Sequence, residues 1–228
     1  MEKVNIAPIA HIRTLFPQKF GIPRQSNIIG GITSTIVFEP EYRNADALRG
    51  IEDFDYLWLI WRFSENERDG WTPTVRPPRL GGNRRMGVFA TRSSFRPNAL
   101  ALSSVRLLDV QWQSSEGPLL HVGGADLMDG TPIYDIKPYL PYTDSHPDAR
   151  SGFAPTPADH LLEVVCPPEL LEMVEPQLRD TLLDTLAHDP RPSYHNSDDR
   201  EYGMAFGKIN VKFKVMKNST LQVLQIFF

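Results

Sequence analysis

Residues 81–104 read GGNRRMGVFATRSSFRPNALALSS and form the centre of an unusually basic interval. From Gly70 to Leu108 there is no Asp or Glu, although the whole chain has a net charge of −4. The arginines of this interval are Arg76, Arg79, Arg84, Arg85, Arg92, Arg96 and Arg106. A planar guanidinium group donates paired hydrogen bonds to carboxylates, phosphates and base edges. The interval therefore predicts an anion-binding surface. The alternative is ion pairing with Asp126, Asp129, Asp135 and Asp144.

The same interval predicts a stiff basic loop on a β scaffold. Residues 86–91 are apolar, which predicts a short buried strand. Pro97 has a restricted φ and biases Arg96 toward extended backbone, so Arg92 and Arg96 are expected to project from a rigid loop. A rigid loop loses little entropy when it binds a ligand.

Strands are also predicted upstream and downstream of this loop. The segments are 4–13, 32–38, 54–63, 100–112 and 118–127, and a single helical turn is predicted at 45–50. Residues 54–63, FDYLWLIWRF, are apolar on both faces, which is typical of a central strand. This strand runs into the polar pair Ser64 and Glu65, and Asp129-Gly130 predicts a turn.

The last third of the chain differs in composition. Residues 144–159 are rich in Pro, Ser, Ala and Asp, which predicts a linker. Beyond it we predict a strand at 161–165, a helix at 168–187 interrupted near Pro176, and strands at 202–215 and 221–228. Lys208, Lys212 and Lys214 are expected on one face of the first of these strands.

Composition and motifs exclude several classes of protein. Cys166 is the only cysteine, and no signal peptide or membrane-spanning apolar run is found, so a cytoplasmic protein without membrane association is expected. No dinucleotide, P-loop, zinc or nucleophile-elbow motif occurs, and the histidines lack metal-ligand spacing, so no metal is expected. A small zwitterionic or nucleoside-like ligand remains the best match.

Long motifs resemble the TrmO family, formerly called TsaA-like, of S-adenosylmethionine-dependent tRNA adenine N6-methyltransferases. They are residues 81–108, DGTPIYDIKPYLPYTDS at 129–145 and DPRPSYH at 189–195, and the resemblance extends to residues 4–25. It implies a mainly β fold with a small β-barrel that binds S-adenosyl-L-methionine, a smaller α+β C-terminal domain that engages tRNA, and a homodimer. The expected domains are 1–145 and 160–228, with a linker at 146–159.

The resemblance also implies a reaction and its site residues. The reaction places a methyl group on N6 of threonylcarbamoyl-adenosine at position 37 of threonine tRNA. The implied cofactor contacts are Pro23, Arg24, Gln25, Ser64, Glu65, Arg92, Leu102, Asp129, Gly130, Thr131 and Pro132. Relatives often have His-Gln at the positions of Ser64 and Glu65, which puts the side-chain roles of this pair in question.

Two further sets of residues are expected at the site. The predicted tRNA contacts are Arg84, Arg85, Arg96, Asp189, Arg191 and Tyr194. The acceptor N6 lies next to a carbonyl and is a poor nucleophile until its proton is removed or bonded to a base, so Asp129, Tyr134 and Asp135 are the candidate proton acceptors.

Two other functions fit the same residues. One is a non-catalytic RNA- or nucleotide-binding β-barrel, and the other is an S-adenosylmethionine-dependent methyltransferase of a small molecule. The presence of both ATRSSFRPN and DPRPSY favours the tRNA enzyme, because a pure binder does not need the first segment and a small-molecule enzyme does not need the second.

Overall fold

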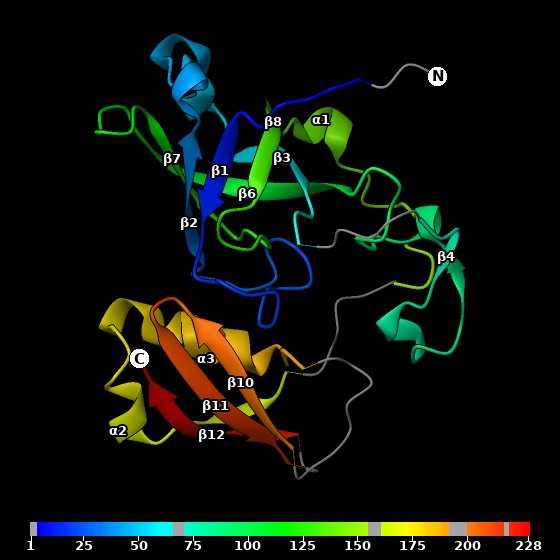
Figure 1. Ribbon diagram of the computed structural model, residues 1–228, viewed down its shortest axis with the longest axis vertical. Coiled ribbons are helices and arrows are strands. Elements are labelled where there is room, and N and C mark those ends of the chain that lie inside the picture. The colour runs from blue at the N-terminus through cyan, green and yellow to red at the C-terminus, as the bar shows by residue number, and fades with distance from the viewer. Residues whose placement is uncertain (1–3, 66–70, 155–160, 192–199, 217–218) are drawn as a thin grey trace.

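A computed structural model describes residues 4–65, 71–154, 161–191, 200–216 and 219–228. Its larger part is a closed antiparallel barrel with the strand order β1-β2-β7-β6-β3-β8 (Figure 1). The strands are β1 (Ala10–Arg13), β2 (Thr33–Phe38), β3 (Tyr56–Arg62), β6 (Leu100–Gln111), β7 (Leu119–Gly123) and β8 (Pro132–Pro138). The predicted mainly β fold with a small barrel is confirmed.

Strand β3 lies between β6 and β8. Leu57 and Leu59 are fully buried in the barrel core, whereas Tyr56 and Trp58 on the alternate positions are only partly covered. The prediction of a central strand here is confirmed, although only one of its two apolar faces is buried. Successive side chains point to opposite faces of a sheet, so one aromatic face of β3 is left on the outside of the barrel.

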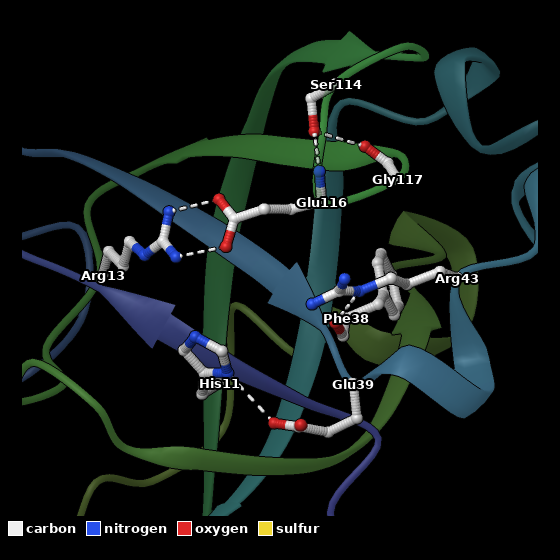
Figure 2. Close-up of polar contacts among 8 residues, drawn as sticks. All are labelled: His11, Arg13, Phe38, Glu39, Arg43, Ser114, Glu116 and Gly117. Carbon is white, nitrogen blue, oxygen red and sulfur yellow. Dashed lines mark hydrogen bonds and ion pairs between the residues drawn. The ribbon is translucent and has the colours of Figure 1, made fainter.

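The barrel closes where β1 pairs with β8, with Ala10 opposite Ile133. Polar contacts also join β1 to the chain after β2 and to the β6–β7 turn (Figure 2). Arg13 donates two hydrogen bonds to Glu116, at 2.7 and 2.6 Å, and Nδ1 of His11 lies 3.0 Å from Oε1 of Glu39. The Arg13 guanidinium lowers the pKa of the Glu116 carboxyl group. The bidentate pair therefore fixes the β6–β7 turn against β1.

Residues 71–90 of the basic interval form an arm outside the barrel (Figure 1), whereas residues 100–108 belong to β6. A two-stranded sheet of β4 (Thr74–Val75) and β5 (Met86–Gly87) is followed by a 3₁₀ turn at Val88–Ala90. The prediction of a buried strand over 86–91 is therefore wrong beyond Gly87. Phe89 is 70 % exposed, and Thr91 donates to the carbonyl of Val88, which closes a turn instead of extending the strand.

The C-terminal part is a four-stranded sheet of order β10-β11-β12-β9, with helices packed on it (Figure 1). Its elements are β9 (Glu163–Val165), α2 (Pro168–Leu171), a 3₁₀ turn (Pro176–Leu178), α3 (Arg179–Ala187), β10 (Glu201–Phe206), β11 (Ile209–Val215) and β12 (Thr220–Phe227). The interrupted helix is confirmed. The single strand predicted over 202–215 is a hairpin, because Gly207 has φ +55° and reverses the chain. Lys208 therefore lies in the turn, apart from Lys212 and Lys214.

The remaining segments connect these two parts. Residues 4–9, predicted as strand, precede β1 without regular structure, and the strand predicted over 118–127 ends early, at Gly123, before Gly124 with φ +73°. Short helical turns occur at Pro40–Tyr42, Ala45–Leu48, Ile51–Asp53, Pro78–Leu80 and α1 (Pro141–Asp144). No helix within the described ranges has the length and apolar character needed to cross a membrane.

The core beneath the C-terminal sheet includes residues from far upstream. Phe16, Ile29 and Ile32, which lie between β1 and β2, pack with Leu182 of α3 and Phe213 of β11. Phe16 is fully buried, and its ring makes an edge contact with Phe206 at 6.0 Å. The segment between β1 and β2 therefore completes the C-terminal core and ties it to the barrel.

Replacing Phe16 by alanine is expected to lower the free energy of unfolding by about 3–5 kcal/mol, because deleting a buried ring leaves a cavity. Urea unfolding followed by circular dichroism measures this change. Phe89→Ala is the matched control and should change the free energy by less than about 0.5 kcal/mol, because the Phe89 side chain is exposed. Equal effects of the two substitutions would remove Phe16 from the core.

Candidate functional site

A cavity of about 790 Å³ opens beside the C-terminal end of β3. Its walls come from the loop before β2, from β3 and its exit, from the loop between β5 and β6, from the start of β6 and from the turn before β8. The lining residues are Lys19, Ile22, Pro23, Arg24, Gln25, Trp58, Ile60, Trp61, Phe63, Ser64, Glu65, Thr91, Arg92, Ser94, Arg96, Leu100, Ala101, Leu102, Ser103, Asp126, Met128 and Thr131. Its volume falls within the range of small-molecule and cofactor sites, about 300–1,000 Å³.

Two paired strands supply the apolar wall of this cavity. Ile60 of β3 lies opposite Leu102 of β6, and Trp61 lies opposite Ala101. Leu102 is 53 % exposed although it is a large apolar residue in the middle of a sheet. An exposed aliphatic and aromatic wall of this kind suits the flat face of a base or another apolar ligand group.

Cations also line this cavity. The side chain of Arg92 donates to Oε1 of Gln25, and Lys19 donates to the backbone carbonyl of Glu65. Arg96 lies deeper, where its guanidinium donates to the carbonyl of Thr91 at 2.8 Å. Within the described residues, no ion pair joins the arginines between 76 and 106 to a carboxylate. The alternative of neutralisation by acidic partners is therefore not observed there, and an anionic ligand group remains the match for this rim.

Two acidic residues, Glu65 and Asp126, line the cavity, and Asp126 lies within the field of Arg92. Oδ1 of Asp126 accepts a hydrogen bond of 2.6 Å from Ser103, whose Oγ in turn accepts one of 3.0 Å from the indole nitrogen of Trp61. Burial raises the pKa of the Asp126 carboxyl group, while the Ser103 hydrogen bond, backbone N–H groups and the charge of Arg92 act in the opposite direction. The site thus contains a fixed carboxylate that holds a proton more readily than an exposed one.

The structure brings together most of the residues predicted to contact a cofactor. Those that line the cavity are Pro23, Arg24, Gln25, Ser64, Glu65, Arg92, Leu102 and Thr131. Asp129, Gly130 and Pro132 are absent from its lining. Gly130 has φ +75°, which confirms the predicted turn and shows why this sequence ends with a glycine there.

The three predicted proton acceptors lie away from the cavity lining. Asp129 is exposed, and its carboxylate accepts a hydrogen bond of 2.9 Å from the backbone N–H of Thr14. The carboxylate of Asp135 lies 3.0 Å from the ammonium group of Lys137 and accepts the backbone N–H of Ile136. Both carboxylates are thus held by local structural contacts, and the catalytic roles of Asp129, Tyr134 and Asp135 stay predictions.

The predicted tRNA contacts fall into two groups. Arg84 and Arg85 are exposed on the arm, where Arg85 reaches the hydroxyl of Thr74 at 3.3 Å. Arg96 lines the cavity instead. Asp189 and Arg191 follow α3 and form the second group, whereas Tyr194 lies outside the described residues.

Asp189 and Arg191 form a tight pair that touches the cavity loop. Asp189 has φ +49°, at the end of α3, and its carboxylate accepts from Nε and Nη2 of Arg191 at 2.8 and 2.9 Å. These hydrogen bonds raise the pKa of Arg191. Arg24 donates to the backbone carbonyls of Asp189, at 3.3 Å, and Arg191, at 3.1 Å. The loop that lines the cavity and the predicted tRNA motif are therefore in direct contact.

Sequence reasoning did not select several residues at the centre of the cavity. The sequence predicts Asp126 only as a salt-bridge partner, and it predicts no role at the site for Ser103, Trp58 and Trp61. The available signals were the alternation of β3, which sets Trp58 on its outer face, and the position of Asp126 three residues before Asp129. No cluster of three or more potential metal-ligating side chains is found in the described parts of the chain.

Comparison with known proteins agrees with this geometry. Residues 11–145 match the tRNA-methyltransferase O N-terminal domain, and residues 166–227 match the TrmO C-terminal domain. A relative from Escherichia coli (strain K12), named tRNA (adenine(37)-N6)-methyltransferase, is 40% identical over 223 residues, covering 94% of each chain. One from Pseudomonas aeruginosa (strain PAO1), named putative S-adenosylmethionine-dependent methyltransferase RcsF, is 35% identical over 238 residues, covering 97% of each.

A solved structure extends the likeness to the fold. The crystal structure of TrmO from Pseudomonas aeruginosa matches with a TM-score of 0.79 at 30% identity, covering 100% of this chain and 99% of that chain. The family matches span both the barrel and the C-terminal sheet. The chain therefore belongs to the tRNA-methyltransferase O family.

Proposed function

We propose that this protein transfers a methyl group from S-adenosyl-L-methionine to N6 of threonylcarbamoyl-adenosine at position 37 of threonine tRNA. Membership of the tRNA-methyltransferase O family supports the reaction class. The observation that carries the proposal is the cavity at the exit of β3, in which a cationic rim, an apolar wall and the Asp126 carboxylate converge.

The residues around the cavity fit the parts of this cofactor. Arg92 supplies a charge-assisted donor for its carboxylate, and Arg24 and Gln25 lie on the same side. Backbone groups at Ser64 and Glu65, which line the cavity, would read the edge of adenine. When bound, the cofactor supplies an electrophilic methyl carbon, and the protein supplies alignment of this carbon with the acceptor nitrogen.

Asp126 is the best-placed proton acceptor for the acceptor nitrogen. As N6 gains a methyl group it must lose a proton, and Asp126 lines the cavity as a carboxylate within the field of Arg92. Ser103 and Trp61 fix the orientation of this carboxylate through two successive hydrogen bonds. A carboxylate with a raised pKa is a better general base than an exposed one.

Two basic surfaces are proposed to hold the tRNA. Arg84 and Arg85 on the arm are positioned for backbone phosphates. Arg191, held by Asp189, lies against the cavity loop through Arg24, so RNA bound there is close to the reacting groups. Asp189 then acts by positioning Arg191, since a carboxylate paired in this way does not itself attract phosphate.

The proposal includes an assembly and a location. We place catalysis in residues 1–145 and additional tRNA contacts in residues 160–228. A cytoplasmic homodimer accommodates the net charge of −4, because the field that attracts RNA is local and two copies can combine their arginine arms.

Labelled methyl transfer tests this function directly. Incubation with labelled S-adenosylmethionine and bulk tRNA that lacks the modification is expected to add one methyl group to threonylcarbamoyl-adenosine, detected by nucleoside mass spectrometry. Label on another nucleoside would overturn the substrate assignment. Cofactor binding without incorporation of methyl groups into tRNA would favour a small-molecule acceptor. Absence of both cofactor binding and methyl incorporation would favour a non-catalytic RNA- or nucleotide-binding barrel.

Arg92→Ala is expected to weaken S-adenosylmethionine binding by about 10- to 100-fold, because a charge-assisted hydrogen bond to the cofactor carboxylate is lost. Isothermal titration calorimetry measures the dissociation constant. Arg84→Ala removes the same charge from an exposed position outside the cavity lining and should leave this constant unchanged. An unchanged constant in Arg92→Ala would take Arg92 out of the cofactor site.

Asp126→Asn is expected to lower the single-turnover rate by about 10²- to 10⁴-fold, because the proton acceptor is lost while its shape is kept. The wild-type rate should rise with pH as Asp126 ionises through its raised pKa, and this rise should vanish in the variant. Cofactor affinity should stay within about threefold of wild type. A variant with a full rate would exclude Asp126 as the base.

The same substitution has an expected effect on stability without any ligand. Burial raises the folded-state pKa of Asp126, so its contribution to stability is present at low pH and is lost as pH rises through that pKa. Asp126→Asn should therefore raise the melting temperature relative to wild type at neutral pH, with a difference that shrinks in acid. A variant that is less stable at neutral pH would instead indicate a structural role.

A further inference from the structure

A second cavity, of about 400 Å³, adjoins the first on the outer face of the barrel. Three residues line both cavities, namely Trp58, Arg92 and Leu102. The residues that line only the second cavity are Ser26, Tyr56, Ser104, Tyr139 and Asp144. The two cavities therefore meet along a seam and can hold two ligands in contact.

The walls of the second cavity are aromatic. Trp58 and Tyr139 have ring centroids 5.5 Å apart at an interplanar angle of 52°, and Tyr56 and Tyr139 have centroids 6.2 Å apart. Tyr56 and Trp58 lie on the outer face of β3, and Tyr139 follows the end of β8. The backbone N–H of Tyr139 donates to the carbonyl of Tyr56 at 2.9 Å, which anchors this third ring.

Hydrogen bonds hold the floor of this cavity rigid. Oδ2 of Asp144 accepts from the indole nitrogen of Trp58 at 2.8 Å and from the backbone N–H of Leu140 at 2.9 Å. These bonds lower the pKa of the Asp144 carboxyl group, so it stays ionised and keeps its partners. A preorganised aromatic floor loses little entropy when a flat ligand stacks on it.

The polar groups suit a nucleobase. Ser26 and Ser104 offer hydroxyls to the edge of a ring, and Arg92 is the one cation among the described lining residues. Aromatic side chains with an arginine and hydroxyls are the usual means of holding a base that has left its stack, and proteins read single-stranded RNA loops through such splayed bases.

We propose that the second cavity binds the acceptor adenine of the tRNA anticodon loop, stacked among Trp58, Tyr139 and Tyr56. This inference rests on the proposed function, since it names where the acceptor of that reaction lies. The seam with the first cavity then brings the exocyclic nitrogen of the base beside the methyl donor. Asp126 is adjacent to this seam, because its carboxylate interacts with Arg92 and with the backbone N–H of Ser26.

A thermodynamic cycle between protein and RNA tests this placement. The probes are two synthetic threonine-tRNA anticodon stem-loops, one with threonylcarbamoyl-adenosine at position 37, called the adenosine loop, and one abasic at that position. Tyr139→Leu is expected to weaken binding of the adenosine loop by about tenfold, the size of one lost base-stacking contact, and to leave the abasic loop unaffected. Tyr139→Phe keeps the ring and should bind both loops as wild type does.

Tyr142→Leu is the matched control, because Tyr142 is 86 % exposed and lines neither cavity. It should alter neither loop. Melting curves of each variant check folding, and the dissociation constant for S-adenosylmethionine should not change in Tyr139→Leu, because Tyr139 lines only the second cavity.

Several outcomes overturn the inference. Equal weakening of both loops by Tyr139→Leu means that the ring contacts RNA elsewhere, and weaker cofactor binding means that the cavity belongs to the cofactor. If Tyr139→Leu differs from wild type in the molecular mass that light scattering measures, a second copy of the chain covers the aromatic outer face of β3. If wild-type protein methylates tRNA while the cycle shows no coupling, the inference fails and the proposed function stands; absence of methylation of any tRNA defeats the proposed function itself.

Discussion

The two-residue alternation of β3 is the constraint on which both cavities depend. Its inner residues, such as Leu57 and Leu59, fill the barrel core, so the outer residues Tyr56 and Trp58 have no core to enter. The strand pairs with β6 on one side and with β8 on the other. A shift of this pairing by one residue would exchange the two faces and expose the inner residues, so the register is fixed. An aromatic outer face thus persists as a consequence of packing on the inner face.

Electrostatics at the site is local and does not follow the net charge. Arginines gather in an interval without acidic residues, and several described carboxylates form ion pairs outside this interval, as in Arg13–Glu116 and Lys137–Asp135. Asp126 is instead half-buried beside Ser103 and lies within the field of Arg92. Cationic groups for binding and a carboxylate with a raised pKa for chemistry thereby line a single cavity.

The C-terminal sheet contributes to the site through the segment between β1 and β2. Phe16 and Ile29 of this segment belong to the C-terminal core, while Pro23 and Gln25 of the same segment line the cavity. Arg24 adds hydrogen bonds to the chain just after α3. The wall of the cavity is therefore held both by the C-terminal core and by the chain that follows α3. Loosening of these contacts would move the residues that border the ligand.

Much of the fold could be predicted from local sequence, because local rules govern it. The strands at 32–38, 54–63 and 100–112, the helix that ends before Asp189 and the Asp129-Gly130 turn follow from periodicity, proline and glycine. The wrong predictions also arise from these local rules. Residues 86–91 are largely apolar, yet only Val88 among them is buried, and no local pattern reveals that an apolar run lies on an arm outside the core.

Local sequence predicts only part of the candidate site, because the rest depends on contacts between residues distant in the chain. The sequence by itself determined the basic loop, the aromatic strand and the absence of common catalytic motifs, since these depend on residue type and spacing alone. Only the tertiary structure decided that Asp126 enters the cavity while Asp129 accepts the N–H of Thr14, and that Trp58 forms part of two cavities. These choices depend on how β3 and β6 pair and on where the barrel closes, which are contacts between residues distant in the chain.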